Sequence, residues 1–365
     1  MTAYLARRLL LLIPTLFGIL LISFTIIQFA PGGPVQTMIA RLKGTDVSAT
    51  ARIGGEADSA GTRLAAGGSA ASLYRGAQGL DPQFIEQLEK QYGFDRPVYE
   101  RFLRMAAAYT RFDFGESYFR HERVSHLMLE KLPVSLSLGL WSTLIIYLVS
   151  IPLGISKAVS HGTRFDVWTS GTIVIAYAVP GFLVAILLIV CFAGGSYLRW
   201  FPLGGLVSDN WSELSVPGKI IDYLWHLILP VSAYALGGFA TLTLLTKNSF
   251  LEEISKLYVV TARAKGLSER RVLYGHVFRN AMLIVIAGMP TAFFEMFIAG
   301  SLLIETIFGL DGLGLLSYES IVNRDYPVVF GMLFVFSLVG LLINLFADML
   351  YTVVDPRIDF ETQGR

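Results

Sequence analysis

Six stretches of this chain are long and apolar enough to cross a lipid bilayer as helices, and this feature limits the folds open to it. A hydrocarbon core of about 30 Å needs about 20 mostly apolar residues in a helix. Only 16% of the residues are charged, against roughly 25% in soluble domains. The sequence therefore predicts an all-α polytopic membrane protein with six transmembrane helices. The six stretches cover residues 9–30, 134–156, 168–193, 225–246, 281–304 and 328–354.

The distribution of Lys and Arg predicts how the chain crosses the membrane. The first apolar run is too long for the core of a signal peptide and lacks a small-x-small cleavage pattern, so it is interpreted as an uncleaved anchor. Basic residues in short loops mark the cytoplasmic side. They concentrate at the N-terminus, after the second, fourth and sixth runs, and above all in residues 247–280. Both termini are therefore expected in the cytoplasm.

The predicted organisation has four parts: an anchor helix at 1–30, an outer segment at 31–133, a five-span core at 134–354 and a cytoplasmic tail at 355–365. Within the outer segment, 44–80 is rich in Gly, Ala and Ser and is expected to be a mobile loop. Amphipathic helices are expected in 81–132, at about 81–93, 97–112 and 121–132. They are either a scaffold lid or a docking surface for a soluble partner, and periodicity does not separate the two.

Several classes of function leave no trace in the sequence. There is no Gly-x-x-x-x-Gly-Lys-Ser/Thr loop for nucleotide and no His-Glu-x-x-His or Cys/His zinc pattern. His121 and His126 are five residues apart and fall on different helical faces. A net charge of +1 argues against a nucleic-acid partner. The chain is therefore expected to have no catalytic residue, no metal site and no enzymatic activity of its own, and Cys191 is interpreted as a small core residue.

Residues 247–280 carry the strongest functional signal. The pattern predicts a helix that begins at Asn248 or Ser249 and ends at Gly266, where a left-handed exit needs no side chain. A second helix is expected from about Ser268. Ala262, Ala264 and Gly266 are small and are expected to let a partner approach the backbone. The plainer interpretation, a basic loop that only fixes orientation, does not account for a long ordered helix between two spans.

This loop resembles the Glu-Ala-Ala loop of type I binding-protein-dependent importers, in the form Thr-Ala-Arg-Ala-Lys-Gly used by their dipeptide/oligopeptide/nickel branch. The consensus Glu falls on Val260, and only Ala262 and Gly266 match the general pattern. The match runs along the whole chain apart from the Gly/Ala-rich insert, and is closest to the B-type permeases of the Yej subgroup. It is carried by Ala3-Tyr4-Leu5-x-Arg7-Arg8-Leu9, Ala30-Pro31-Gly32-Gly33-Pro34, Tyr92-Gly93-Phe94-Asp95-x-Pro97, Phe112-Asp113-Phe114-Gly115-x-Ser117, Trp141–Tyr147, Ile304-Glu305-Thr306-Ile307-Phe308, Asn323-Arg324-Asp325-Tyr326-Pro327 and Asp355-Pro356-Arg357.

The resemblance implies a permease subunit of the bacterial inner membrane with a type I ABC importer fold. Its implied partners are a second six-span permease, two ATPase modules (separate or fused) and a periplasmic peptide-binding protein. ATP and Mg would be bound by the ATPase, and alternating access would move oligopeptides, or peptide antibiotics such as microcin C. The residues implied to couple to the ATPase are Tyr258, Thr261, Ala262, Arg263, Ala264, Lys265 and Gly266.

Three carboxylates are further candidates. Glu295 lies halfway along the fifth span, and an ionisable residue at that depth is a functional candidate for the translocation path; a protonated or partner-contacting carboxylate is the alternative. Glu305 and Asp325 lie in the outer loop before the sixth span, where they are expected to meet the binding protein. Prolines inside spans, such as Pro180, are expected to bend them, and Gly181 and the Gly237-Gly238 pair to allow close helix packing.

The competing class is a secondary transporter driven by an ion gradient, acting without an ATPase. Such a protein needs coupling carboxylates near the midplane and usually internal repeats. Glu295 is the one serious candidate for such a carboxylate, and the two halves show no clear repeat. A channel filter is not recognisable.

Overall fold

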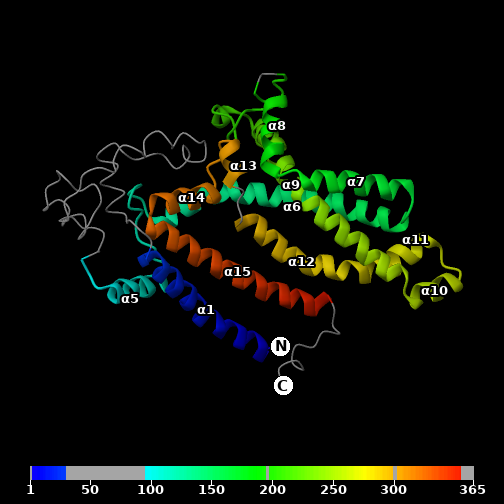
Figure 1. Ribbon diagram of the computed structural model, residues 1–365, viewed down its shortest axis with the longest axis horizontal. Helices are drawn as coiled ribbons and strands as arrows, with labels where there is room; N and C mark the ends of the chain where they lie inside the picture. The colour runs from blue at the N-terminus through cyan, green and yellow to red at the C-terminus, as the bar shows by residue number, and fades with distance from the viewer. Residues whose placement is uncertain (1, 30–94, 195–196, 299–301, 355–365) are drawn as a thin grey trace, which may run out of the picture. The chain divides into compact units, whose positions relative to one another are not determined.

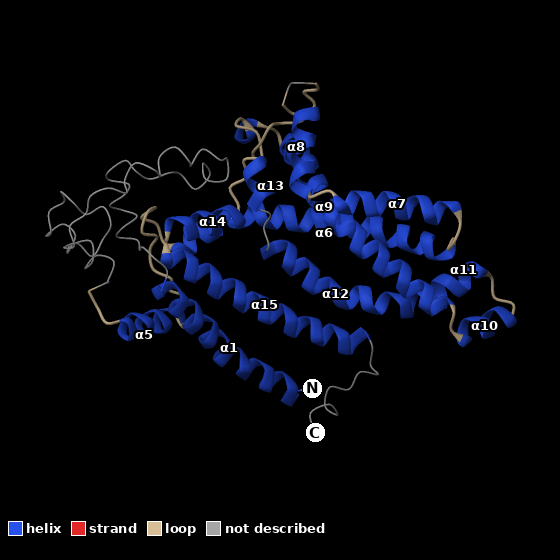
Figure 2. Ribbon diagram, in the orientation of Figure 1, coloured by secondary structure: helices blue, strands red, loops and turns tan. Residues whose placement is uncertain are grey.

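The computed structural model describes residues 2–29, 95–194, 197–298 and 302–354 (Figure 1). Every regular element in these ranges is a helix (Figure 2). The predicted loop 44–80, the predicted helix 81–93 and the tail 355–365 lie outside the described residues. The helices are α1 (Thr2–Phe29), α5 (Val98–Tyr109), α6 (Val124–Val159), α7 (Arg164–Ala178), α8 (Gly181–Phe192), η3 (Trp211–Glu213), α9 (Val216–Ile254), α10 (Leu257–Ala264), α11 (Glu269–Val272), η4 (Leu273–Val277, a π-helical turn), α12 (Phe278–Ile298), α13 (Leu302–Ile307), α14 (Leu313–Asn323) and α15 (Tyr326–Val354).

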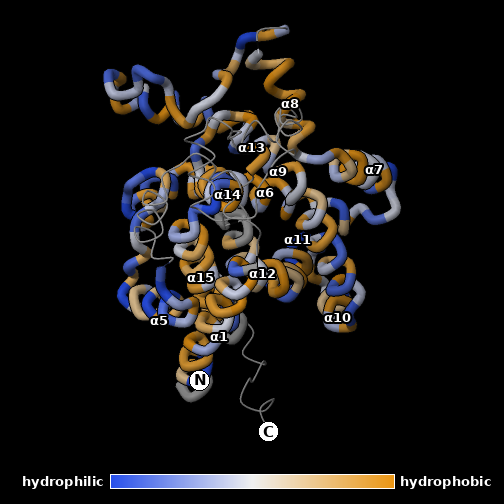
Figure 3. The backbone as a smooth tube through the Cα atoms, turned by 60° about the vertical axis from the view of Figure 1, so that its left-hand side comes forward, coloured by the Kyte–Doolittle hydropathy of each residue, from blue (hydrophilic) through white to orange (hydrophobic). Residues whose placement is uncertain are grey.

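Five helical segments are long and apolar enough to cross a membrane, and the bent pair α7–α8 makes up to six. Hydrophobic residues, orange in Figure 3, dominate α8 and α15. The five long segments agree with the predicted runs, because about 20 consecutive apolar residues leave a chain few alternatives to a spanning helix. They are Leu5–Gln28, Val124–Val159, Val216–Ile254, Glu269–Ala292 and Tyr326–Leu350.

The third predicted span, 168–193, is not one continuous helix. It consists of α7 and α8, whose axes differ by 92°. Val179 between them has an extended backbone, and Pro180 precedes the first residue of α8. Proline has no N–H to continue a helix and disfavours the helical conformation of the residue before it. The bend expected at Pro180 is therefore a complete break.

Contacts divide the chain into two compact units. One contains Ala6–Leu132 and Leu315–Val339. Its core is aromatic: Phe24 of α1 lies 5.4 Å from Phe102 of α5 and 5.8 Å from Phe330 of α15, measured between ring centroids. The predicted helix at 97–112 is present as α5. The predicted helix at 121–132 is not separate, because the chain enters α6 at Val124 and continues without a break into the second span.

The other unit contains Met1–Leu5, Pro133–Gly314 and Gly340–Arg365. It has two clusters of buried hydrophobic residues. The first joins α6, α9, α10, α11 and α12 around Phe250, Val259 and Val285. The second joins α6, α8, α9 and α13 around Ala185, Leu229 and Phe308. α6 and α9 contribute to both clusters, so these two helices join the two parts of the core of this unit.

Candidate functional site: the α9–α12 connection

The connection between α9 and α12 is ordered throughout. The prediction of a new helix at residue 248 or 249 required α9 to end there, but α9 continues to Ile254. Asn248 and Ser249 lie inside α9, and the Ser249 hydroxyl donates to the Ala281 carbonyl of α12 at 2.6 Å. The chain breaks at Ser255 and Lys256, and α10 then begins at Leu257. The predicted single helix is therefore two helices.

The end of α10 agrees with the prediction for Gly266. Its φ is +80°, in the left-handed region that glycine adopts without strain. The Gly266 N–H donates to the Arg263 carbonyl at 2.9 Å, and the Leu267 N–H donates to the Ala262 carbonyl at 3.3 Å. These two bonds form the Schellman closure. As predicted, a second helix follows Ser268, namely α11.

Burial separates the inner and outer faces of α10. Val259 and Ala262 are buried in the first hydrophobic cluster. Contrary to the expectation from the sequence, Ala262 therefore does not offer its small side chain to a partner. A helix of eight residues, about two turns, has an inward face when it packs on a core, and residue type alone does not indicate which alanine lies on that face. Tyr258 is half-buried. The exposed members of the predicted set are Thr261, Arg263, Ala264, Lys265 and Gly266.

Two large apolar residues on the outer face were missed by the sequence reasoning. Leu257 is 84% exposed and Val260 is 55% exposed. The signal was present, because a large apolar residue within the most basic loop has no bilayer to cover it. Apolar side chains grouped on an otherwise polar surface mark interaction sites.

Polar contacts hold the hairpin formed by α10 and α11 in shape. The Arg263 guanidinium forms a bidentate pair with the Glu269 carboxylate, at 2.8 and 3.0 Å, across the turn. The Tyr258 hydroxyl donates to Glu253 at 2.6 Å, and Lys256 pairs with the same carboxylate. Burial, then the bond to Glu253, raises the pKa of Tyr258, so this hydroxyl keeps its proton as a donor.

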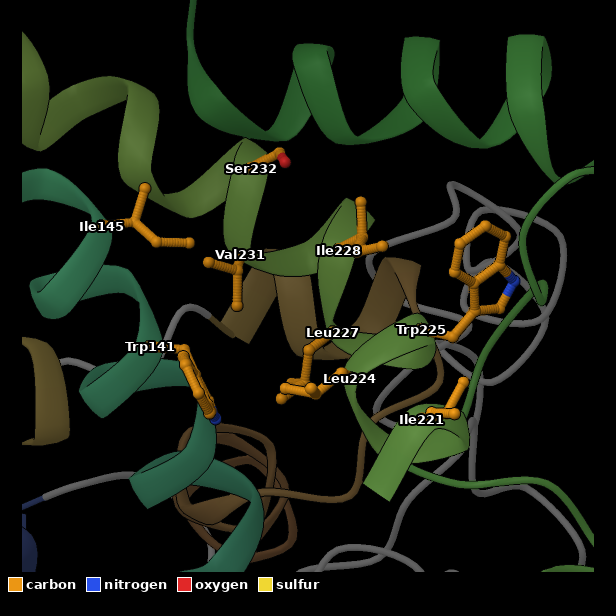
Figure 4. Close-up of a pocket in the computed structure, with 9 residues that line it drawn as sticks. All are labelled: Trp141, Ile145, Ile221, Leu224, Trp225, Leu227, Ile228, Val231 and Ser232. Carbon is orange, nitrogen blue, oxygen red and sulfur yellow. The ribbon is translucent and has the colours of Figure 1, made fainter. Parts of the chain in front are cut away.

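Beside this hairpin lies a cavity of about 360 Å³. Its polar rim is formed by Arg263, Glu269 and Arg270. Its apolar lining comes from the C-terminal end of α6, from α9, α11 and η4. A second cavity, of about 370 Å³, lies between α6 and α9 (Figure 4). Trp141 and Ile145 of α6 lie opposite Leu227 and Val231 of α9, and the Trp141 indole donates to the Tyr223 hydroxyl at 3.1 Å. Its lining is apolar apart from Ser232, so this cavity suits apolar groups.

The outer carboxylates predicted to meet a binding protein are both buried. Glu305 is fully buried and accepts a long bond from the Ser135 hydroxyl at 3.4 Å; that hydroxyl also accepts from the Leu313 N–H at 2.9 Å. Gly312 packs so closely on the Glu305 carboxylate that an added Cβ would lie 2.7 Å from it. In the conformation described, Glu305 therefore holds the α13–α14 turn from inside.

Asp325 has a comparable internal role in the other unit. It is 4% exposed, accepts from the Ser117 hydroxyl at 2.5 Å and accepts from the Tyr118 N–H at 3.0 Å. Burial raises the pKa of this carboxyl despite those bonds. Two of the motifs that carry the family resemblance thus contact each other, 208 residues apart.

Two other candidate groups receive no assignment. The backbone of Glu295 lies in α12, but its side chain is outside the described residues. Glu122, His126 and Glu130 lie close together near the start of α6, with their potential ligand atoms within 4.8 Å. All three are exposed, and Glu130 pairs with Lys131 at 2.7 Å. We assign no metal to this group.

The fold and this connection define a multi-pass helical membrane protein with an exposed, self-closed helix between two spanning segments. Residues 150–360 match the family described as binding-protein-dependent transport system inner membrane component. The chain belongs to that family. It is the permease component of an ATP-driven importer in the inner membrane, and the family works with ATPase and substrate-binding partners.

Three relatives match over almost their whole length. The chain is 63% identical to the peptidoglycan transport system permease protein YejB of Agrobacterium fabrum, covering 99% of both chains. It is 59% identical to the inner membrane ABC transporter permease protein YejB of Escherichia coli O157:H7, over 99% of this chain and 100% of the relative. It is 35% identical to the oligopeptide transport system permease protein AppB of Bacillus subtilis, over 99% and 100%. The predicted resemblance is thereby confirmed.

Proposed function

We propose that the cargo consists of short peptides, including the peptide portion of peptidoglycan fragments. The support is the named cargo of the relatives: peptidoglycan for the protein at 63% identity and oligopeptides for the protein at 35% identity. The cargo class shared by these names is the short peptide. Antibiotic peptides such as microcin C fall in the same class. This chain forms half of the translocation path, and a second six-span permease forms the other half.

The site where the ATPase docks is the outer face of α10. The observation that carries this assignment is the pair of exposed apolar side chains, Leu257 and Val260, on a helix closed by its own backbone at Gly266. Exposed anchors on a rigid helix suit insertion into a groove of a partner. The exposed residues Thr261, Arg263, Ala264 and Lys265 surround that contact, while Tyr258 and Ala262 support it from within.

The remaining partners follow from this assignment. Two ATPase modules, separate or fused, bind ATP and Mg, and this chain supplies no cofactor site. A periplasmic peptide-binding protein delivers cargo to the outer side. Glu305 and Asp325 lie beneath the surface that receives it, and Glu295 remains a candidate for the path. The concentration of Lys and Arg in residues 247–280 supports a cytoplasmic position for α10 and for both termini.

The test is transport by the complete complex, purified from its native membrane and reconstituted in liposomes. Uptake of a labelled tripeptide and of a labelled peptidoglycan fragment is measured with ATP on the α10 side, and separately with a proton gradient and no ATP. We expect uptake only with ATP and the binding protein. Uptake driven by the gradient alone would support the ion-coupled alternative and overturn the proposal.

A further inference from the structure

Three charged side chains are buried together at one corner of the core unit. Lys157 is at the end of α6, Asp166 is in the first turn of α7 and Lys247 is on α9. Their side chains are 0%, 6% and 12% exposed. The Lys247 ammonium lies 2.7 and 2.8 Å from the two carboxylate oxygens of Asp166. The Lys157 ammonium lies 3.1 Å from one of the same oxygens. Charges this deeply buried are rare unless they are paired.

The α6–α7 corner is held by its own bonds, without Lys247. Lys157 donates to the Asp166 carbonyl at 3.0 Å, to the Thr169 hydroxyl at 2.7 Å and to the Ser170 hydroxyl at 2.8 Å. The Gly162 N–H donates to the Asp166 carboxylate at 3.2 Å. These partners all lie within a short stretch of chain. Lys247 comes from 81 residues further along.

The charge balance shows that Lys247 is not required for neutrality. Lys157 and Asp166 already form a neutral pair, and Lys247 adds a second cation to one carboxylate. Desolvating an additional ammonium opposes folding. Removing it leaves no unpaired buried carboxylate, whereas removing Asp166 would leave two buried cations. A stabilising role therefore accounts for Asp166 but leaves Lys247 unexplained.

The position of Lys247 along α9 indicates what it does. α9 continues for seven residues beyond it to Ile254, and α10 follows almost at once. Asp166 begins the helix that leads to the break at Pro180. The Lys247–Asp166 bond thus joins the end of α9 that carries the docking helix to the first half of the broken span.

We propose that Lys247 is a positioning residue that makes α7 follow α9 when the ATPase shifts α10. The inference rests on the proposed docking of an ATPase at α10. The bond fixes the inner end of α7 to α9, so a displacement of α10 reaches the broken span as well as α9 and α12. Without the ammonium, α9 moves while α7 stays behind, and ATP hydrolysis is no longer converted fully into transport.

The first test compares Lys247→Met, Lys247→Arg and the control Lys219→Met in the complete complex. Lys219 lies at the opposite end of α9, with its ammonium 4.8 Å above the Trp211 ring. For Lys247→Met we expect the amount of peptide imported per ATP hydrolysed to fall about tenfold, within the usual range of coupling between sites. Lys247→Arg retains a cation with donors that match a carboxylate, so it should keep most of the peptide imported per ATP hydrolysed. The control should match the wild type.

The second test measures the motion itself. Spin labels are placed at Trp168, which is 77% exposed on α7, and at Glu252, whose side chain is 75% exposed on α9, in a Cys191→Ser background. In the otherwise wild-type complex, the distance between labels should be the same before and after trapping with ATP. In Lys247→Met, that distance should change on trapping.

The outcomes separate the two proposals. If the wild type requires ATP but Lys247→Met keeps its transport ratio and its label distance, the inference is overturned, even where the melting temperature falls. Such a result would show a purely structural role. If wild-type uptake ignores ATP, the proposed function fails first and the inference fails with it.

Discussion

Gly266 offers the sharpest test of the docking helix. Its φ is +80°, and an added Cβ would meet no atom within 4 Å. The penalty of a side chain at this position is therefore backbone strain and not a clash. Left-handed backbone costs an ordinary residue about 1–2 kcal/mol, and a β-branched residue lies at the upper end of the range because its backbone is more restricted.

From this geometry we expect Gly266→Val to destabilise the closed α10–α11 turn by about 2 kcal/mol. A free-energy change of 1–2 kcal/mol alters the ratio of two states by a factor of about 5–30. The ratio of closed to open α10–α11 turns should fall by that factor, and the peptide imported per ATP hydrolysed should fall with it. Gly266→Asn should keep most of the peptide imported per ATP hydrolysed, because asparagine adopts the left-handed region several-fold more readily than other residues.

The assay is peptide uptake and phosphate release measured on the same liposomes, with the loaded binding protein present. The matched control is Gly115→Val. Gly115 has a φ of +75° and open space around its Cβ position, but lies in the outer segment. It should lower the melting temperature by a similar amount without changing the ratio. Normal coupling in Gly266→Val, or equal uncoupling in the control, would refute the reasoning.

Three other predictions follow from burial and packing. Leu257→Asp places a charge in the proposed ATPase groove and should weaken ATPase binding by about 2 kcal/mol, as at an interface hot spot. Val216→Asp, at a comparably exposed site in the first turn of α9, should leave binding unchanged in the same titration. Asp325→Ala removes the acceptor of the Ser117 hydroxyl and of the Tyr118 N–H and should lower stability by about 1–3 kcal/mol. Because folding raises the pKa of Asp325, its contribution to stability is full below the ordinary value of 3.8 and is lost as pH rises through the folded pKa. Asp325→Asn should therefore flatten the dependence of the melting temperature on pH. An unchanged dependence would contradict the assignment. In Gly154→Ala the added Cβ would lie 2.6 Å from a threonine Cβ of α9, so this variant should destabilise the protein by about 1–3 kcal/mol. In Gly237→Ala the added Cβ meets open space, so this variant should stabilise the protein by about 0.5–1 kcal/mol. Changes of the melting temperature with the same sign in both variants would count against the packing described.

The features predicted well from the sequence are those that local chemistry determines. Five of the six apolar runs form long helices, because an apolar segment in a bilayer must satisfy its own backbone. Gly266 ends α10, because a left-handed residue is needed there and glycine supplies it. Pro180 interrupts its span for an equally local reason, although the size of the bend depends on what packs around the break.

The features missed depend on neighbours distant in sequence. Ala262 and Ala264 are the same residue type two positions apart, and only the packing of α10 against the first cluster decides that Ala262 is inside. Glu305 was expected at the surface, where its loop was predicted to lie, but it is buried and accepts a bond from Ser135, 170 residues earlier. Of the glycines expected to allow close packing, Gly181 does so, because an added Cβ would lie 3.3 Å from the Ala233 carbonyl oxygen, whereas an added Cβ at Gly237 would meet no atom within 4 Å. Periodicity identifies faces but not the partners of those faces.

The uninterrupted length of α9 has a geometric consequence. Followed along its axis, its 39 residues cover about 58 Å at 1.5 Å per residue, nearly twice the thickness of a hydrocarbon core of about 30 Å. Such a length magnifies small rotations: if the helix pivots as one body about one end by about 5°, the other end moves by up to about 5 Å, close to one turn of helix. A small rearrangement at the Val216 end of α9 therefore arrives at α10 as a displacement comparable to the size of a side chain.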